Sequence, residues 1–81
     1  MISHDTLREI EKIDEQMIDL LSQRMMLCQE ALEEDEDALG AEYHATVISH
    51  WEGAADERGW STAVLGKICR AVMEFCKTGG E

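Results

Sequence analysis

One apolar pattern extends over the first part of the chain and constrains what the rest can fold into. From Leu7 to Ala31, apolar side chains recur at spacings of three and four residues, which is typical of an amphipathic helix. We therefore predict a first helix over about residues 5–32, beginning at a capping box that pairs Thr6 with Glu9. The side chains of this apolar stripe are Leu7, Ile10, Ile13, Met17, Leu20, Leu21, Leu27, Cys28 and Ala31.

The length of this predicted helix bears on assembly. Roughly 28 residues at about 1.5 Å each make a helix about 42 Å long, whereas a compact chain of 81 residues has a radius of gyration of roughly 12 Å. The helix would therefore protrude and leave its apolar stripe in water. An intertwined homodimer, in which the first helices of two copies pack antiparallel, is the simplest way to cover the stripe.

A second helix follows a run of five acidic residues, Glu33–Asp37, which interrupts the apolar pattern. Apolar spacing predicts this helix over Glu42–Arg58. Gly59 in a left-handed conformation, with apolar Trp60 beyond it, is expected to end the helix in a Schellman motif.

A third helix is predicted from an N-cap at Ser61 or Thr62 to the pair Gly79–Gly80. The chain has no proline and few aromatic residues, and it is rich in Glu, Leu, Ala, Met and Ile, which favours helix over strand. We therefore predict an all-α fold, with three helices in a single domain that spans residues 1–81. The residues of the third helix's apolar face are Val64, Leu65, Ile68, Cys69, Val72, Phe75 and Cys76.

The charge balance excludes several classes of function. With 18 acidic and 7 basic residues, the net charge is −11, so the chain would repel nucleic acid. No window is apolar enough to span a membrane, and the acidic N-terminal segment lacks the basic start of a signal peptide. We expect a cytoplasmic protein. The acidity is equally compatible with a high-salt host, and composition alone does not distinguish the two.

Cysteine and histidine patterns predict neither a disulfide nor a metal site. Cys28, Cys69 and Cys76 form no CxxC pair, so we expect buried thiols. His50 lies six positions after His44, about 120° away around a helix, which is a poor geometry for chelating one metal ion. The acidic run also lacks the spaced ligands of a calcium loop.

Arg24 is the most informative charged residue. It shares a row of the stripe with Ile10, Met17 and Ala31, each seven residues from the next, so a cation interrupts the buried face. A buried guanidinium needs an anionic partner. We expect Arg24 to be partly buried against a bound carboxylate or a protein carboxylate such as Glu74, unless its head extends to solvent.

His44 lies on the apolar stripe of the second helix with Ile48, Trp51 and Ala55, so its side chain is expected to point inward. It is a candidate acid, base or ligand, although an inward histidine of this kind is more often a hydrogen-bonded core residue.

Two segments carry a family resemblance. Leu7–Arg24, with the sequence LREIEKIDEQMIDLLSQR, resembles the first helix of the all-helical chorismate mutases, and Ile68–Glu74, with the sequence ICRAVME, resembles their last helix. The resemblance implies a three-helix protomer that dimerises through its long first helix. It also implies conversion of chorismate to prephenate by an intramolecular rearrangement without a cofactor. In that reaction arginines hold the two carboxylates, and a lysine with a glutamine or glutamate donates to the ether oxygen.

In the first helix only part of the family's site has a counterpart. The arginine that closes the helix motif corresponds to Arg24. The arginine that opens it corresponds to Leu7, and the nearby Arg8 lies one step and about 100° away. The catalytic lysine corresponds to a position within the acidic run Glu33–Asp37.

The later family positions have also changed type. The family's Asp-x-x-Arg-Glu corresponds to Gly40, Tyr43 and His44, while its serine and glutamine correspond to Cys76 and Gly80. The resemblance leaves five candidate anion- or substrate-binding residues, namely Arg24, Arg8, His44, Tyr43 and Cys76.

Two functional hypotheses follow. We favour a degenerate chorismate mutase-like homodimer that acts as a scaffold, or binds a small carboxylate or a protein partner, with little or no mutase activity. The alternative is a divergent active mutase that recruits Arg8, His44, Lys67 or Arg70 into its site. A minimised mutase is a third possibility. None of these requires a cofactor or a metal.

Overall fold

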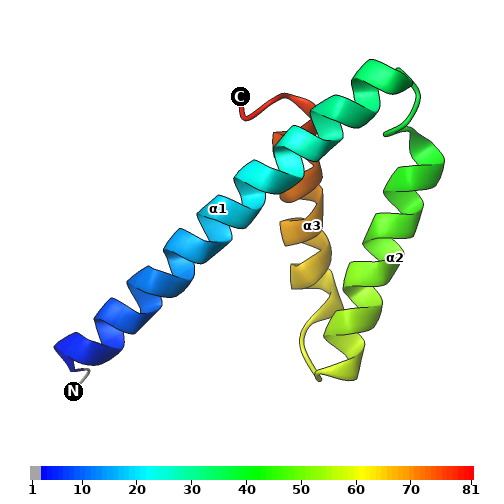
Figure 1. Ribbon diagram of the computed structural model, residues 1–81. Helices are drawn as coiled ribbons and strands as arrows, with labels where there is room; N and C mark the ends of the chain where they lie inside the picture. Colours follow the sequence, from blue (N-terminus) through cyan, green and yellow to red (C-terminus); the bar gives the residue numbers. More distant parts are fainter. Residues whose placement is uncertain (1–2) are drawn as a thin grey trace.

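The computed structural model describes residues 3–81, and the three helices within that range confirm the all-α prediction (Figure 1). These helices are α1 (His4–Glu34), α2 (Ala41–Glu57) and α3 (Thr62–Lys77). The first two residues of the predicted 1–81 domain lie outside the described residues. None of the helices in the described range is long and apolar enough to cross a lipid bilayer.

The start of α1 differs from the predicted capping box. Ser3 is the N-cap, and its hydroxyl oxygen accepts a hydrogen bond from the backbone N–H of Thr6 at 3.2 Å. Ser3 is itself a strong N-cap residue three positions before Thr6, so the helix starts earlier and Thr6 lies in its first turn. At the other end α1 extends to Glu34, two residues beyond the predicted end, with the acidic run interrupting it there.

α2 and α3 both end at glycines with positive φ, at the positions that the sequence predicts. At the end of α2, Gly59 has φ of 72°, and the Trp60 N–H donates to the Ala55 carbonyl oxygen at 2.8 Å. This bond is the long hydrogen bond of a Schellman motif. The end of α3 repeats it, because the Gly80 N–H donates to the Phe75 carbonyl oxygen at 2.9 Å.

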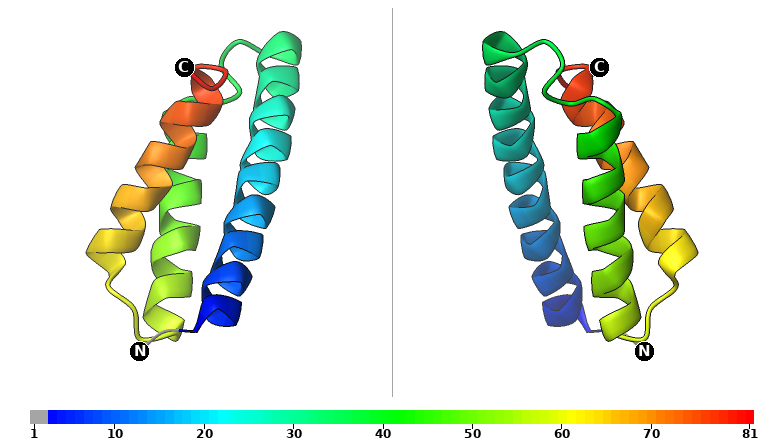
Figure 2. Two further views of the ribbon diagram at one scale, coloured as in Figure 1. Left: turned by 90° about the vertical axis from the view of Figure 1, so that its left-hand side faces the viewer. Right: turned by 90° about the vertical axis from the view of Figure 1, so that its right-hand side faces the viewer.

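The molecule is elongated because α1 is longer than the rest of the fold. Its 31 residues span about 46 Å, and the chain measures 50 × 26 × 17 Å with a radius of gyration of 15.2 Å. α3 packs against both α1 and α2. The C-terminal half of α1 therefore belongs to the packed part of the fold, while its N-terminal half extends away from α2 and α3 as an arm (Figure 1). Seen from the side, α1 lies next to the pair formed by α2 and α3 (Figure 2).

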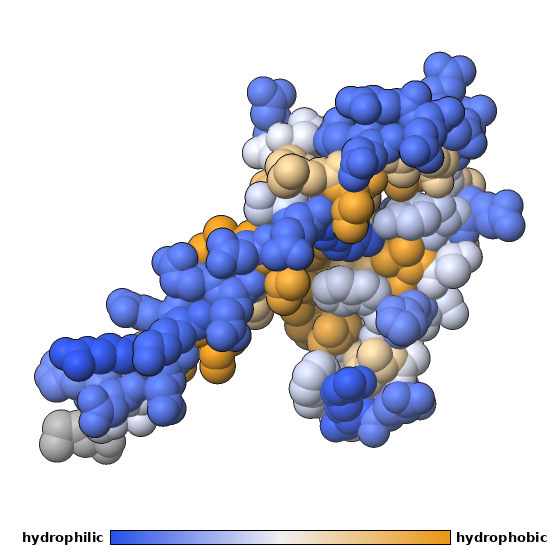
Figure 3. Space-filling view, viewed as in Figure 1, coloured by the Kyte–Doolittle hydropathy of each residue, from blue (hydrophilic) through white to orange (hydrophobic). Residues whose placement is uncertain are grey.

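The packed part has a small core. Its buried apolar side chains are Cys28, Ala55, Cys69, Met73 and Cys76, and all three cysteines are free and buried, as predicted. Most of the stripe of α1 is exposed instead, and apolar atoms emerge at the edges of the arm (Figure 3). A single copy of the chain thus buries Cys28, partly covers Leu21 and Ala31, and leaves the rest of the stripe, Leu27 included, in contact with water.

Candidate functional site

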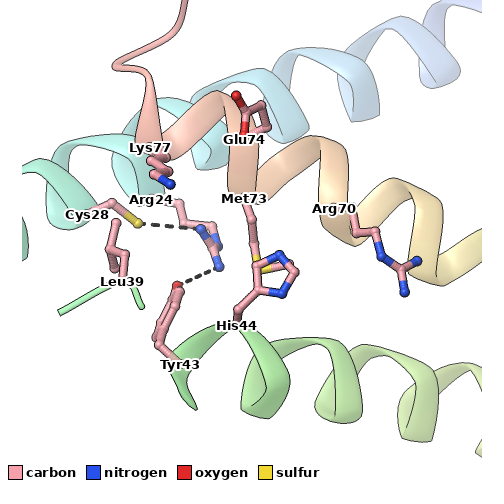
Figure 4. Close-up of a pocket in the computed structure, with 9 residues that line it drawn as sticks. All are labelled: Arg24, Cys28, Leu39, Tyr43, His44, Arg70, Met73, Glu74 and Lys77. Atoms are coloured by element: carbon pink, nitrogen blue, oxygen red, sulfur yellow. Dashed lines mark hydrogen bonds between the residues drawn. The ribbon is translucent and has the colours of Figure 1, made fainter. Parts of the chain in front are cut away.

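A cleft of about 100 Å³ lies where the C-terminal half of α1, the start of α2 and the second half of α3 come together (Figure 4). We refer to it as the Arg24 cleft. It is lined by Arg24, Cys28, Leu39, Tyr43, His44, Arg70, Met73, Glu74 and Lys77.

The Arg24 guanidinium is half-buried in this cleft, as its position on the stripe predicts. Its Nη2 donates to the Tyr43 hydroxyl oxygen at 2.9 Å, and its Nη1 donates to the Cys28 sulfur at 3.5 Å. Of the two partners expected for Arg24, the protein carboxylate such as Glu74 is replaced by a phenol and a thiol, and the bound carboxylate stays a prediction. The charge of Arg24 is therefore oriented by neutral groups and not neutralised by them.

Arg24 is charged at neutral pH, as arginine side chains in proteins are. Burial opposes the charged guanidinium, but attraction by Cys76 and Tyr43 in their ionised forms, at high pH, outweighs it, so the pKa of Arg24 is raised. Burial also raises the pKa values of the Tyr43 phenol and the Cys28 thiol, so both groups are protonated at neutral pH. The cleft thus contains an uncompensated positive charge.

The lining of the cleft is unusually basic for this chain. Of the 7 basic residues in the sequence, Arg24, Arg70 and Lys77 line it, and of the 18 acidic residues only Glu74 does. A positive region in a chain of net charge −11 is the kind of site that attracts small anions. Arginine side chains in particular match the geometry of a carboxylate.

The structure brings together some of the predicted site residues and separates others. Arg24, Tyr43 and His44 line the same cleft. Cys76 is fully buried beside Arg24 and contributes to its electrostatic surroundings. Arg8 lies 16 residues before Arg24 on the same helix, about 24 Å along its axis, so within one chain it stays out of the cleft.

His44 does not point into the core as predicted. Its side chain is exposed overall and lines the Arg24 cleft. The buried residue of α2 is Ala55, which lies near the C-terminal end of the helix and not near His44. α2 packs against α3. The start of α2 borders the cleft instead, which explains why a residue of the apolar pattern is accessible there.

Lys77 was not predicted as a site residue, although its spacing along the third helix indicates that it lies on the same face as Arg70. Arg70, Met73, Glu74 and Lys77 are spaced by three, one and three residues, which places them on one face of α3. Lys67, which the alternative hypothesis named, is not among the residues that line the cleft, whereas Arg70 is. Within the described part of the chain, no group of three or more His, Cys, Asp or Glu residues is arranged to hold a metal ion.

The three-helix fold agrees with one family comparison. The chain matches the family model described as chorismate mutase type II over residues 7–79. It therefore belongs to that family, and the resemblance found in the sequence is confirmed. No match was found among curated proteins or among solved structures.

Proposed function

We propose that this protein is a dimeric member of the chorismate mutase type II family that binds a small carboxylate in the Arg24 cleft and has little or no mutase activity. The observation that carries the proposal is the half-buried Arg24 guanidinium, whose hydrogen-bond partners are both neutral. A charge held out of bulk water without a counterion is costly, so an anion that enters the cleft gains the interaction that the protein does not supply.

The other basic residues of the cleft favour an anion with two carboxylates. Arg70 and Lys77 lie on one face of α3, and Arg24 is contributed by α1, so positive charge borders the cleft from two helices. One carboxylate can pair with Arg24 while a second pairs with Lys77 or Arg70. A small dicarboxylate fits this charge pattern.

The same cleft lacks most of what the family's rearrangement needs. The acidic run occupies the segment of the family's lysine, and Gly80 occupies the position of its glutamine. Removing one preorganised donor typically lowers the rate by roughly 100- to 1,000-fold. With more than one donor replaced, we expect the protein to bind a dicarboxylate without accelerating its rearrangement appreciably.

A divergent active mutase is the second candidate, and one observation favours it. Arg70 and His44, which that hypothesis recruits into the site, do line the Arg24 cleft, and Lys77 joins them. An ammonium group or an imidazole N–H at this place could take the role of the replaced lysine. The two candidates share the binding step and differ only in turnover.

The dimer is supported by the exposed stripe of α1. Leu7, Ile10, Ile13, Met17 and Leu20 have exposed fractions between 46% and 62% in the single chain. A continuous apolar surface of this kind on a protruding helix is typical of an interface. A second copy offers the same stripe, and two such helices packed antiparallel would cover one another.

The binding step is tested by isothermal titration calorimetry with succinate and chorismate as dianions. Succinamide serves as a neutral control of the size of succinate. We expect both dianions to bind and succinamide not to bind. Replacement Arg24→Gln should abolish binding, while Lys67→Gln, which removes a charge outside the cleft, should leave it unchanged. Equal binding of succinamide, or unchanged binding by Arg24→Gln, would contradict the proposal.

Turnover separates the two candidates. Chorismate loss is followed by absorbance with purified protein and with the Arg24→Gln variant. We expect no turnover above the uncatalysed rate. Turnover at roughly 1 to 1,000 per second that disappears in the variant would show instead that the site is an active mutase.

A further inference from the structure

The hydrogen bond between Arg24 and Tyr43 has a defined direction. A guanidinium only donates, so the Tyr43 oxygen must accept from Arg24 Nη2 across the 2.9 Å separation. The phenolic proton is therefore not used in this bond. The Cys28 thiol is the protein group that competes for it, and a thiol is a weak hydrogen-bond acceptor.

Tyr43 is also placed where a ligand would meet it. Its side chain extends from the first turn of α2 towards the end of Arg24, and both side chains line the cleft (Figure 4). An anion that contacts the free N–H groups of Arg24 would therefore be near the phenol as well.

We infer that Tyr43 is a specificity-determining residue. Its hydroxyl orients the Arg24 guanidinium and donates a hydrogen bond to the carboxylate that this guanidinium binds. The inference rests on the proposed carboxylate site and adds the group that selects the ligand. A charge-assisted hydrogen bond from a hydroxyl to a carboxylate oxygen is short and strong. A neutral amide accepts a weaker one, so the phenol favours a carboxylate over an amide of the same shape.

The protonation state of Tyr43 suits this role. Its pKa is raised by burial, so the phenol keeps its proton through the physiological range. Tyrosine at this position adds a donor without adding charge. The cleft then binds one carboxylate with a single guanidinium and a phenol, and leaves Arg70 and Lys77 for the second carboxylate.

The decisive variant is Tyr43→Phe, which removes only the hydroxyl. Titration calorimetry with succinate and chorismate should show binding weaker by about 10- to 100-fold, the effect of losing one hydrogen bond to a charged group. Thr46→Val is the matched control, because it removes a hydroxyl one turn further along α2, where Thr46 bonds the Glu42 carbonyl oxygen. It should bind like the wild type.

A second measurement needs no variant. Tyr43 is the only tyrosine in the chain, so tyrosine absorbance during an alkaline titration reports this one phenol. A bound carboxylate that accepts a hydrogen bond from the phenol should raise the pKa of Tyr43 further, because a nearby negative charge disfavours the phenolate. Saturating succinate should therefore shift the titration to higher pH, and succinamide should leave it in place.

The outcomes separate the two proposals. If the wild type binds succinate or chorismate but Tyr43→Phe binds equally well or more tightly, the carboxylate site stands and the role of Tyr43 is overturned, since the phenol would then only block Arg24. If the pKa of Tyr43 stays unchanged when the ligand is bound, the role is overturned as well. If neither dianion binds the wild type, the proposed function itself fails.

Discussion

Gln29 on α1 donates from Nε2 to the backbone carbonyl oxygen of Cys76 on α3 at 2.7 Å. The same nitrogen lies 3.4 Å from the carbonyl oxygen of Lys77. The last carbonyl groups of a helix have no partner within the helix, so a side chain of α1 caps the C-terminus of α3 here. This contact joins α1 and α3, two of the three helices that border the Arg24 cleft.

Replacing Gln29 should therefore destabilise the fold. We expect Gln29→Ala to lower the free energy of unfolding by about 1–2 kcal/mol, because it leaves a part-buried carbonyl oxygen without its donor. The change is measured by urea unfolding followed by circular dichroism. Gln23→Ala, an exposed glutamine of the same helix, is the control and should change stability by less than about 0.5 kcal/mol. Equal effects of the two variants would contradict the capping role.

Replacement by alanine should change the free energy of unfolding in opposite directions at Gly53, within α2, and at Gly59, just after α2. Gly53 lies within the helix with nothing within 4 Å of the position of a Cβ, so Gly53→Ala should raise the free energy of unfolding by about 0.5–1 kcal/mol. Gly59 has φ of 72°, so Gly59→Ala should lower it by about 1 kcal/mol. Chemical denaturation of both variants tests the pair. A stabilising Gly59→Ala would show that the Schellman end does not form in solution.

The dimer can be tested at a side chain that the single chain leaves exposed. Leu20 is 62% exposed, so Leu20→Asp has little effect on a monomer but places a carboxylate within an α1–α1 interface. We expect light scattering to give twice 9.1 kDa for the wild type and a smaller mass, or loss of helical signal, for the variant. Ser22→Asp adds the same charge outside the stripe and should leave the mass unchanged. A wild-type mass of 9.1 kDa at tens of micromolar would rule the dimer out.

Stability should fall at alkaline pH. The pKa values of Cys28, Cys69 and Tyr43 are all raised by burial, so the unfolded chain releases these protons at lower pH than the folded chain does. Their contribution is complete below about pH 8 and decreases as the pH rises past the ordinary values of about 8.5 for cysteine and 10 for tyrosine.

Urea unfolding at pH 7, 9 and 10 measures this dependence. Cys69→Ala removes one of the buried titrating groups, so its stability should fall less steeply over the same range. A free energy of unfolding that is constant or rising up to pH 10 would be inconsistent with burial of these groups.

The helices and their ends were largely predictable because the interactions that define them are local. The 3–4 spacing of the stripe placed α1 within two residues of its observed end, and Gly59 with Trp60 predicted the Schellman end of α2. The start of α1 was misplaced because two hydroxyl residues, Ser3 and Thr6, both suit an N-cap, and the earlier one is used.

The candidate site was predictable in part. The position of Arg24 on the stripe predicted its partial burial, and the family resemblance singled out Tyr43 and His44, which the structure brings to the same cleft. Spacing along one helix does not say which residues of another helix will face it. For that reason the protein group expected beside Arg24 was an acid such as Glu74, whereas the structure places the Tyr43 phenol there. The other expected partner, a bound carboxylate, stays a prediction.

What the sequence determined by itself was therefore the helical fold, the ends of its helices and the excess of negative charge, because hydrogen bonding within three to five residues and composition decide them. The tertiary structure decided where the few positive charges gather. Packing of α3 against α1 and α2 brings Arg24, Arg70 and Lys77 to one cleft, although up to 53 positions separate them in the chain. The angle and register at which two helices pack depend on side chains of both, so this arrangement exists only once the helices have met.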